Sequence, residues 1–320
     1  MKDPLFGASR ESRNPLRFLL PLAVFVTVLV AWEAVVRLRG IPPYILPAPS
    51  LIGATMIADW PLLSASLLTT LETTLAGLLL AVVGGVGLAV LLSLSKAVEY
   101  SLYPIAVVLQ VTPVIAIAPL LLIYMPQDVA VLTCAWLVAF FPVLSNTMLG
   151  LQSVDRNLME LFRLYGAPAS QSASARLEAR LKALWYLRRP AALPAFLAGL
   201  RIAGGLSLIG AVVAEMAAGS AGAGSGLAYR IIESQYRLNI PRLFAALILL
   251  TATGVAIFAL TSLVSWLTLR RKAYNAAGTS NDKILVTLSP TRDVKYKYLI
   301  DVYQAALQAG YEKIAFTTSH

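Results

Sequence analysis

The stretch of sequence that decides the fold runs from Val129 to Leu151 and reads VAVLTCAWLVAFFPVLSNTMLGL. It contains no charged side chain. As a helix it is long enough to cross the ~30 Å hydrocarbon layer of a bilayer. Pro142 is compatible with a spanning helix, because neighbouring helices re-satisfy the backbone group that a proline leaves free. The stretch therefore predicts a membrane-spanning helix.

Five other ranges have the same character, and we expect further spans near 17–37, 67–93, 102–124, 195–217 and 242–269. Hydrophobic residues make up 58% of the chain and charged residues only 13%, with a mean hydropathy of +0.74. Soluble domains carry about 25% charged residues. The sequence thus predicts an all-α polytopic membrane protein with a bundle of about six transmembrane helices.

The net charge of +10 has a topological explanation. Lys and Arg collect on cytoplasmic loops. Most of the 26 basic residues lie in 1–17, beside Lys96, in 152–201 and at 270–272, which are all on one side if the spans alternate. We therefore place the N-terminus, residues 1–16, in the cytoplasm. The bilayer explains the charge, so nucleic acid is not an expected partner.

Metal and nucleotide chemistry find little support in the sequence. Cys134 is the single cysteine and His320 the single histidine, so a Cys/His metal site is not expected. The glycine-rich loop 219–226 follows no predicted strand and is not followed by Gly-Lys-Ser/Thr. No Walker A pattern occurs, so we expect no cofactor in this chain and expect any ATP to bind a partner subunit.

Four ionisable side chains fall inside the predicted spans, namely Glu33, Glu72, Arg201 and Glu215. Such groups face a bundle interior or lie near an interface. We expect Glu33 and Glu72 to reach water and Arg201 to extend to the cytoplasmic surface. Glu215 has two interpretations, a place on the solute path or an ion pair with a loop arginine such as Arg230.

The segment 152–194 is amphipathic, predicted to be cytoplasmic, and lies between two spans. Such a segment either docks a partner through its apolar face or lies in the membrane interface with its arginines reaching water. The residues alone leave these two interpretations open.

Three residues of this segment, Glu160, Gly166 and Pro190, resemble the EAA signature of the permease subunits of ATP-binding-cassette (ABC) importers. The surroundings resemble the nitrate/taurine/sulfonate branch, which includes transporters of pyrimidine precursors. The similarity covers about 15–275, with the transmembrane permease domain at 17–272. Other stretches that carry it are 46–50, 110–119, 140–142 and 199–215.

This resemblance implies a subunit of the bacterial inner membrane that dimerises with a second copy. It implies two cytoplasmic ATPase subunits, which bind the ATP, and a soluble binding protein that delivers solute. It also implies that the segment 152–194 couples to the ATPase, and that a solute path runs through the spans. The candidate coupling residues are Glu160, Gly166, Arg188, Pro190 and Pro194, and the candidate path residues are Glu215, Gln110 and Pro113.

The chain departs from the family in the signature itself. Pro190 follows Gly166 by 24 positions instead of about 13, an excess of about 11 residues within 168–183. Eleven residues are close to three helical turns, so helix phase survives while the reach grows by ~16 Å. Arg189 also stands where the family commonly has an apolar residue. Our hypothesis from the sequence is that the insertion weakens coupling, so that deleting it raises transport.

The residues after Lys272 differ in composition from the rest. We interpret 273–282 as a linker, 284–289 and 313–318 as strands, and 296–309 as a helix, a β-α-β appendage. Residues 283–320 resemble the end of the periplasmic domain of the ExbD/TolR family, around 293–296 and 309–315. That domain is periplasmic, whereas the charge pattern places this tail in the cytoplasm.

Function therefore has a main interpretation and two alternatives. The main one is a permease subunit of an ABC importer, with no catalysis of its own. The alternatives are a chimeric or force-transducing ExbD/TolR-like membrane component, and a membrane enzyme, for which no convergent catalytic set is found. The sequence does not identify the solute.

Overall fold

The computed structural model describes residues 16–165, 173–219, 225–278, 286–288 and 314–316. Its helices are α1 (Leu16–Leu38), α2 (Pro49–Ala58), α3 (Trp60–Leu94), α4 (Lys96–Val111), α5 (Val114–Tyr124), α6 (Gln127–Gln152), α7 (Arg156–Tyr165), α8 (Ala173–Ala183), α9 (Arg189–Ala218), α10 (Leu227–Tyr236) and α11 (Ile240–Gly278). A π-helical segment, Leu184–Arg188, joins α8 to α9. Contacts divide the chain into two compact units, Met1–Ser262 and Leu263–His320.

Five helices in the described part of the chain are long and apolar enough to cross a membrane. These spans are Leu19–Leu38, Trp60–Leu94, Gln127–Gln152, Glu178–Ala218 and Ile240–Arg270. They contain five of the six ranges that the sequence predicts, apart from the first two residues of the first range. The polytopic helical fold is thereby confirmed.

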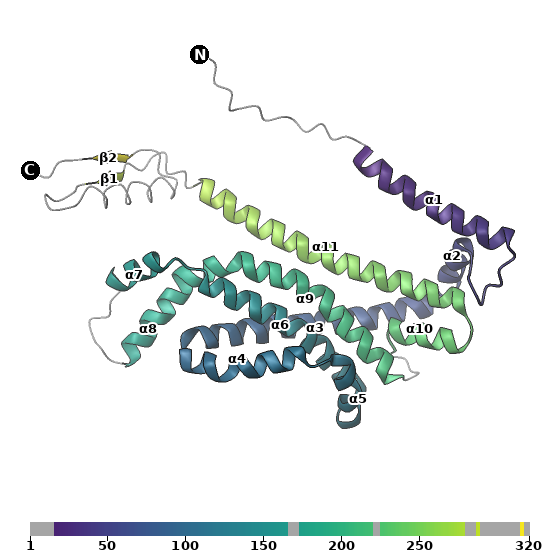
Figure 1. The fold of residues 1–320 in the computed structure, drawn as a ribbon, viewed down its shortest axis with the longest axis horizontal. Coiled ribbons are helices and arrows are strands. Elements are labelled where there is room, and N and C mark those ends of the chain that lie inside the picture. The colour runs from purple at the N-terminus through teal and green to yellow at the C-terminus, as the bar shows by residue number, and fades with distance from the viewer. Residues whose placement is uncertain (1–15, 166–172, 220–224, 279–285, 289–313, 317–320) are drawn as a thin grey trace, which may run out of the picture. The chain divides into compact units, whose positions relative to one another are not determined.

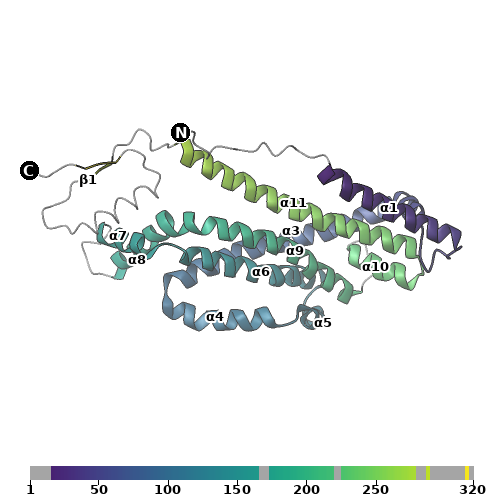
Figure 2. The ribbon, with the colours of Figure 1, turned by 45° about the horizontal axis from the view of Figure 1, so that its top comes forward.

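The sixth predicted range, 102–124, is two helices and not one. Helix α4 ends at Val111 and α5 begins at Val114, and α5 leaves the direction of α4 (Figures 1 and 2). Pro113 lies between them in an extended conformation, with φ −65° and ψ 118°. A proline lacks the N–H that would continue the helix, and it disfavours helical geometry at the preceding residue.

The centre of the first unit is formed by α3, α6 and α9, which lie side by side (Figure 1). Small residues allow their backbones to approach closely, as in many membrane bundles. A Cβ added at Gly210 would lie 2.6 Å from the carbonyl oxygen of Cys134, and one at Gly199 would lie 2.7 Å from that of Pro142. Both glycines of α9 therefore set its distance from α6.

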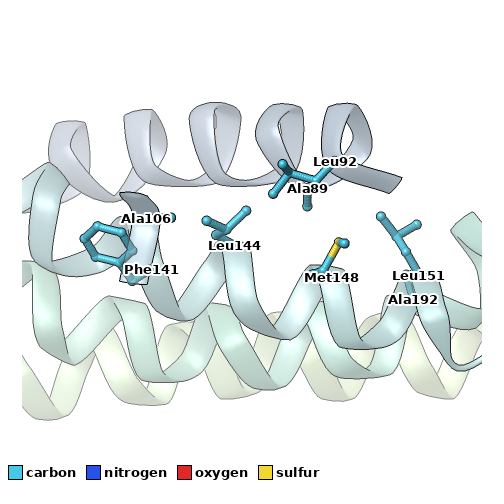
Figure 3. Close-up of a cluster of buried hydrophobic side chains, with 8 residues drawn as sticks. All are labelled: Ala89, Leu92, Ala106, Phe141, Leu144, Met148, Leu151 and Ala192. Atoms are coloured by element: carbon cyan, nitrogen blue, oxygen red, sulfur yellow. The ribbon is translucent and has the colours of Figure 1, made fainter. Parts of the chain in front are cut away.

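One end of this bundle has an apolar core shared by four helices (Figure 3). Side chains of α3, α4, α6 and α9 interlock there, and Figure 3 shows those of α6 pointing between the neighbouring helices. Because lipid is as apolar as these side chains, packing and dispersion stabilise the cluster more than the hydrophobic effect does. Its members are Ala89, Leu92, Ala106, Phe141, Leu144, Met148, Leu151 and Ala192.

The second unit differs from the sequence prediction at its linker. Helix α11 continues to Gly278, although 273–282 was expected to be a linker. The reason is that Ala, Arg and Lys, which dominate residues 270–277, are strong helix formers. Strands β1 (Val286–Leu288) and β2 (Ile314–Phe316) pair in parallel within the predicted strand ranges. The predicted helix 296–309 lies outside the described residues, so the β-α-β appendage stays a prediction.

Candidate functional site

The break at Pro113 opens a small pocket in the bundle. Its volume is about 210 Å³, and Gln110, Thr112 and Val114 line it from the broken pair of helices. Phe141 and Pro142 of α6 and Leu206 of α9 form the facing wall, together with Leu137 and Val138. The pocket thus places an amide and a hydroxyl in the same cavity as an aromatic ring, and none of the described residues that line it is charged.

The three predicted path residues do not come together. Gln110 lines the pocket and Pro113 forms the break beside it, and both are exposed. Glu215 is not among the lining residues. It lies nine residues beyond Leu206 on α9, about 13 Å along the helix axis. The structure therefore separates Glu215 from the other two.

Glu215 instead joins three helices through its carboxylate. The Thr70 hydroxyl of α3 donates to Glu215 Oε1 at 2.8 Å, and the backbone N–H of Ala228 donates to Oε2 at 3.1 Å. Ala228 is the second residue of α10, so the carboxylate satisfies one of the four N–H groups that a helix leaves free at its start. A negative charge at a helix N-terminus is also favoured by the helix dipole. We call Glu215, Thr70 and the first turn of α10 the carboxylate node.

The carboxylate node is closed to solvent. Glu215 is 5% exposed and Thr70 is 0% exposed. Leu227 N–H donates to Thr70 Oγ1 at 2.8 Å, so Thr70 satisfies a second free N–H of α10. A Cβ on Gly226 would overlap the Glu215 carboxylate, so this approach needs glycine.

Sequence reasoning missed the residues that hold α3 against its neighbours. Ser66, Thr70 and Thr74 are spaced by four, lie on one face of α3 and are all buried. Ser66 accepts from Arg230 Nε at 2.9 Å, and Ser207 of α9 donates to the Thr74 carbonyl oxygen at 2.8 Å. The signal that could have found this polar stripe is the i, i+4, i+8 spacing of hydroxyl residues in an apolar helix.

The predicted pair between Glu215 and Arg230 is absent from the contacts of the described residues. Arg230 forms an ion pair with Glu233 at 2.7 Å within α10, and Glu233 also pairs with Arg237 at 3.0 Å. Arg230 further donates to Ser225 at 3.3 Å. Its ion-pair partner therefore lies within α10, and the preceding loop supplies a further hydrogen-bond acceptor.

The other ionisable residues of the spans have separate surroundings. Glu33 accepts from the Ser50 backbone N–H at 3.0 Å and from its hydroxyl at 2.7 Å, which ties α1 to the start of α2. Glu72 is exposed on α3 and forms no hydrogen bond or ion pair with any residue the structure describes. Arg201 lies 6.0 Å from the centre of the Phe258 ring.

Four of the five predicted coupling residues lie in described helical segments between α6 and the core of α9. Glu160 is exposed on α7, whereas Gly166 lies outside the described residues. Pro190 and Pro194 are exposed on the first turns of α9. The π-helical segment ends just before Pro190, and Arg189 N–H bonds to the Leu184 carbonyl across the wider turn. A proline cannot bond to the carbonyl four residues earlier and clashes with it, which favours a wider turn at this point.

Two arginines of this segment bind the end of α3. Arg188 Nη1 donates to the Ser93 carbonyl oxygen at 3.0 Å, and Arg180 Nη1 donates to that of Leu94 at 2.9 Å. Leu94 is the last residue of α3, so both carbonyls belong to the four that a helix leaves without partners. Positive charge there is also favoured by the helix dipole. We call this contact the arginine clamp.

The arginine clamp includes a residue from the region of the predicted insertion. Helix α8 has 11 residues and lies within 168–183, the region of the excess. Residues 166–172 lie outside the part of the chain that the structure describes. Arg180 comes from α8, so half of the clamp comes from the region in which the sequence places the excess. Nearby, Lys96 Nζ binds Glu99 at 2.7 Å, which raises the pKa of the lysine, and Gln152 of α6 donates to the same carboxylate at 3.3 Å.

Comparisons with known proteins point to one family. Residues 77–272 match the family model described as binding-protein-dependent transport system inner membrane component. A probable ABC transporter permease protein of Haemophilus influenzae is 33% identical over 76% of this chain and 94% of its own length. The formylaminopyrimidine transport permease protein of Halalkalibacterium halodurans is 34% identical over 75% of this chain and 90% of its own. The riboflavin transport system permease protein of Chloroflexus aurantiacus is 32% identical over 84% and 98%.

A solved structure gives the same fold. The chain aligns with an amino acid ABC transporter crystallised with histidines at a TM-score of 0.52 and 21% identity, over 68% of this chain and 97% of the other. The family model matches residues 77–272, which belong to the helical body, so the comparison favours the permease interpretation over a force-transducing component. The similarity of residues 283–320 to ExbD/TolR stays a prediction.

Proposed function

The chain belongs to the family of binding-protein-dependent transport system inner membrane components, and from this membership we propose where it contacts solute and how it is driven. It is the membrane-spanning permease subunit of an ABC importer, a transport subunit and not a catalytic one. The family implies ATPase subunits and a soluble solute-binding protein as partners.

We propose that solute passes the pocket at the Pro113 break, and that the solute is a neutral nitrogen heterocycle. The observation that carries this is the lining of the pocket. The Gln110 amide both donates and accepts hydrogen bonds, and Phe141 offers an aromatic face. Pyrimidine and flavin rings present alternating donors and acceptors on a flat surface. An anion such as a sulfonate finds no positive charge among the lining residues.

The names of two relatives support the same class of solute. The formylaminopyrimidine and riboflavin permeases are 34% and 32% identical to this chain, and the taurine permease of Escherichia coli is 28% identical. The first two carry heterocycles by name. This agrees with the pocket.

Uptake by the complete importer in proteoliposomes tests the proposal. The permease is reconstituted with its ATPase and binding protein, and uptake of labelled formylaminopyrimidine, riboflavin and taurine is compared. We expect uptake of a heterocycle and about tenfold less of it in Gln110→Ala, because the amide partner is lost. Gln235→Ala, an exposed glutamine of α10, is the matched control. Uptake of taurine alone, or equal uptake by both variants, would contradict the proposal.

We propose that α7 and the π-helical segment dock the ATPase, that ATP binds only to that partner, and that two copies of this chain form the path. Glu160 is exposed and so available to a partner. Glu160→Gln is expected to lower ATP hydrolysis by the complex, with Glu178→Gln, an exposed acid of α8, as the control. Hydrolysis by the permease without the ATPase would contradict this assignment, and the mass of the purified complex tests the dimer.

We propose that the N-terminus is cytoplasmic, as the distribution of basic residues indicates. Cys134 is buried, which gives a low background for cysteine labelling. A membrane-impermeant maleimide should label Leu238→Cys in spheroplasts, and Ser153→Cys only after permeabilisation. Both positions are exposed in the structure. The reverse pattern would invert the topology.

A further inference from the structure

A groove lies between α3, α6 and the start of α9, apart from the pocket at Pro113. Its volume is about 660 Å³, which is within the range of ligand pockets. Valines of α3, namely Val82, Val83, Val86 and Val90, form one wall. From Val82 to Val90 this wall is about 12 Å long. Leu193 and Phe196 of α9 face it.

Most residues that line the groove are apolar, and they lie in helices that are apolar enough to span a membrane. Val83 is 66% exposed, so the groove is open on the side of α3. Gly87 also lines it, and a Cβ added to Gly87 would meet no atom within 4 Å. In a bilayer such an open apolar groove is accessible to an acyl chain.

Two polar side chains, Thr147 and Arg189, line the groove. Thr147 is 4% exposed, and its Oγ1 makes no hydrogen bond with any residue that the structure describes. Buried hydroxyls are normally hydrogen-bonded, so an unpartnered hydroxyl on a residue that lines a cavity points to a ligand with an acceptor oxygen. The second group is the guanidinium of Arg189, which lines the groove beside Trp185.

Arg189 supplies a positive charge to the groove. Its guanidinium stacks 4.2 Å from the centre of the Trp185 ring, and no ion pair joins it to a carboxylate in the described part of the chain. Tryptophan and arginine are typical of the level at which lipid headgroups lie. Arg189 also follows the clamp residue Arg188, at the end of the bundle that carries the coupling segment.

We propose that this groove binds one anionic phospholipid, with an acyl chain along the valine wall, an ester oxygen at the Thr147 hydroxyl and the phosphate at Arg189. An anionic amphiphile matches all three features, because one molecule supplies the acyl chain, the acceptor oxygen and the negative charge. The bound lipid would brace the π-helical segment, because Leu184 and Trp185 line the same groove.

Lipid analysis of the purified complete importer tests this site. The complex is equilibrated with mixed micelles of phosphatidylglycerol and phosphatidylcholine, repurified, and examined by native mass spectrometry. We expect about one retained phosphatidylglycerol per copy of this chain and about fivefold preference over phosphatidylcholine. Gly87→Leu fills the groove and should abolish retention. Arg189→Gln should remove the preference, and Thr147→Val should weaken retention of both lipids.

Gly205→Leu is the matched control, since a Cβ there also meets no atom within 4 Å and Gly205 does not line the groove. It should retain lipid like the wild type. Equal retention of the two lipids by the wild type, or unchanged retention in Gly87→Leu, overturns the proposal. A Gly87→Leu variant that keeps its lipid but changes its oligomeric mass would assign the groove to a second copy. Competition by inorganic phosphate alone would reduce the site to an adventitious ion only.

Discussion

The two ends of α3 are fastened to the rest of the bundle in opposite ways. At one end the carboxylate node places Glu215 and Thr70 on the N-terminus of α10, and both residues are buried. At the other end the arginine clamp places Arg180 and Arg188 on the C-terminus of α3, and Arg180 is exposed. Each charge has the sign that the helix dipole favours. Both contacts therefore follow the same electrostatic rule with charges of opposite sign, and they differ in how deeply they are buried.

This difference in burial predicts which end of α3 is held firmly and which end can separate from its partners more easily. Breaking a buried polar contact leaves its partners without hydrogen bonds, whereas water replaces the partner of an exposed one. Elements that move are drawn from the parts of a protein with the lowest local stability. We therefore expect the node to hold structure and the clamp to tune coupling.

The largest expected effect is at Glu215. Glu215→Ala leaves the Ala228 N–H and Thr70 hydroxyl without their partner in a closed site, which should cost about 3 kcal/mol. The melting temperature of the purified protein, followed by fluorescence in detergent, should fall by roughly 5–10 °C. Glu72→Ala, an exposed acid of the same bundle, should leave it unchanged. Equal shifts for the two variants would show that the node is not a structural contact.

The second-largest expected effect tests how closely Gly226 approaches the Glu215 carboxylate in the carboxylate node. Gly226→Ala places a methyl group where the Glu215 carboxylate lies, which should cost about 2 kcal/mol. Gly205→Ala is the control, because its added Cβ meets no atom within 4 Å. Thermal unfolding of both variants under one set of conditions checks this. A stable Gly226→Ala would mean that α10 can shift away from α9 without loss.

The clamp should show a smaller loss of stability and a larger effect on coupling. Arg180→Gln combined with Arg188→Gln removes two charges from the end of α3, about 1 kcal/mol in total. A change of that size alters the population of the coupled state about fivefold. Transport per ATP hydrolysed by the reconstituted complex should fall accordingly. Lys182→Gln, which breaks only the exposed pair with Glu178 at 2.7 Å, is the control.

The clamp also reverses the expected result of deleting the insertion. From the sequence we expected deletion within 168–183 to raise transport. The structure gives that region a contact with Leu94, so we now expect deletion to lower transport to the level of Arg180→Gln alone. Transport above the wild-type level would support the original hypothesis.

The sequence predicted the parts of this fold that depend on composition and period. Long apolar runs located five spans because length and hydropathy decide them. It did not predict that Pro113 breaks a helix while Pro104 and Pro119 lie within helices, because that depends on whether neighbours re-satisfy the backbone. Nor did it connect Glu215 with Thr70, which are 145 positions apart and meet only when α3 packs on α9.

The smallest expected effect concerns two serines of the bundle, one whose hydroxyl forms a hydrogen bond between helices and one whose hydroxyl forms none with the described residues. Ser207→Ala removes the bond to the Thr74 carbonyl oxygen and should cost about 0.6 kcal/mol, the average for such contacts between spanning helices. Ser262 also has a buried hydroxyl, but it has no partner among the described residues, so Ser262→Ala should leave stability unchanged or raise it. Melting temperatures that fall by roughly 1–2 °C for the first variant only would rank the polar stripe of α3 below both the node and the clamp in its contribution to stability. Equal shifts would mean that the stripe contributes packing and not hydrogen bonding.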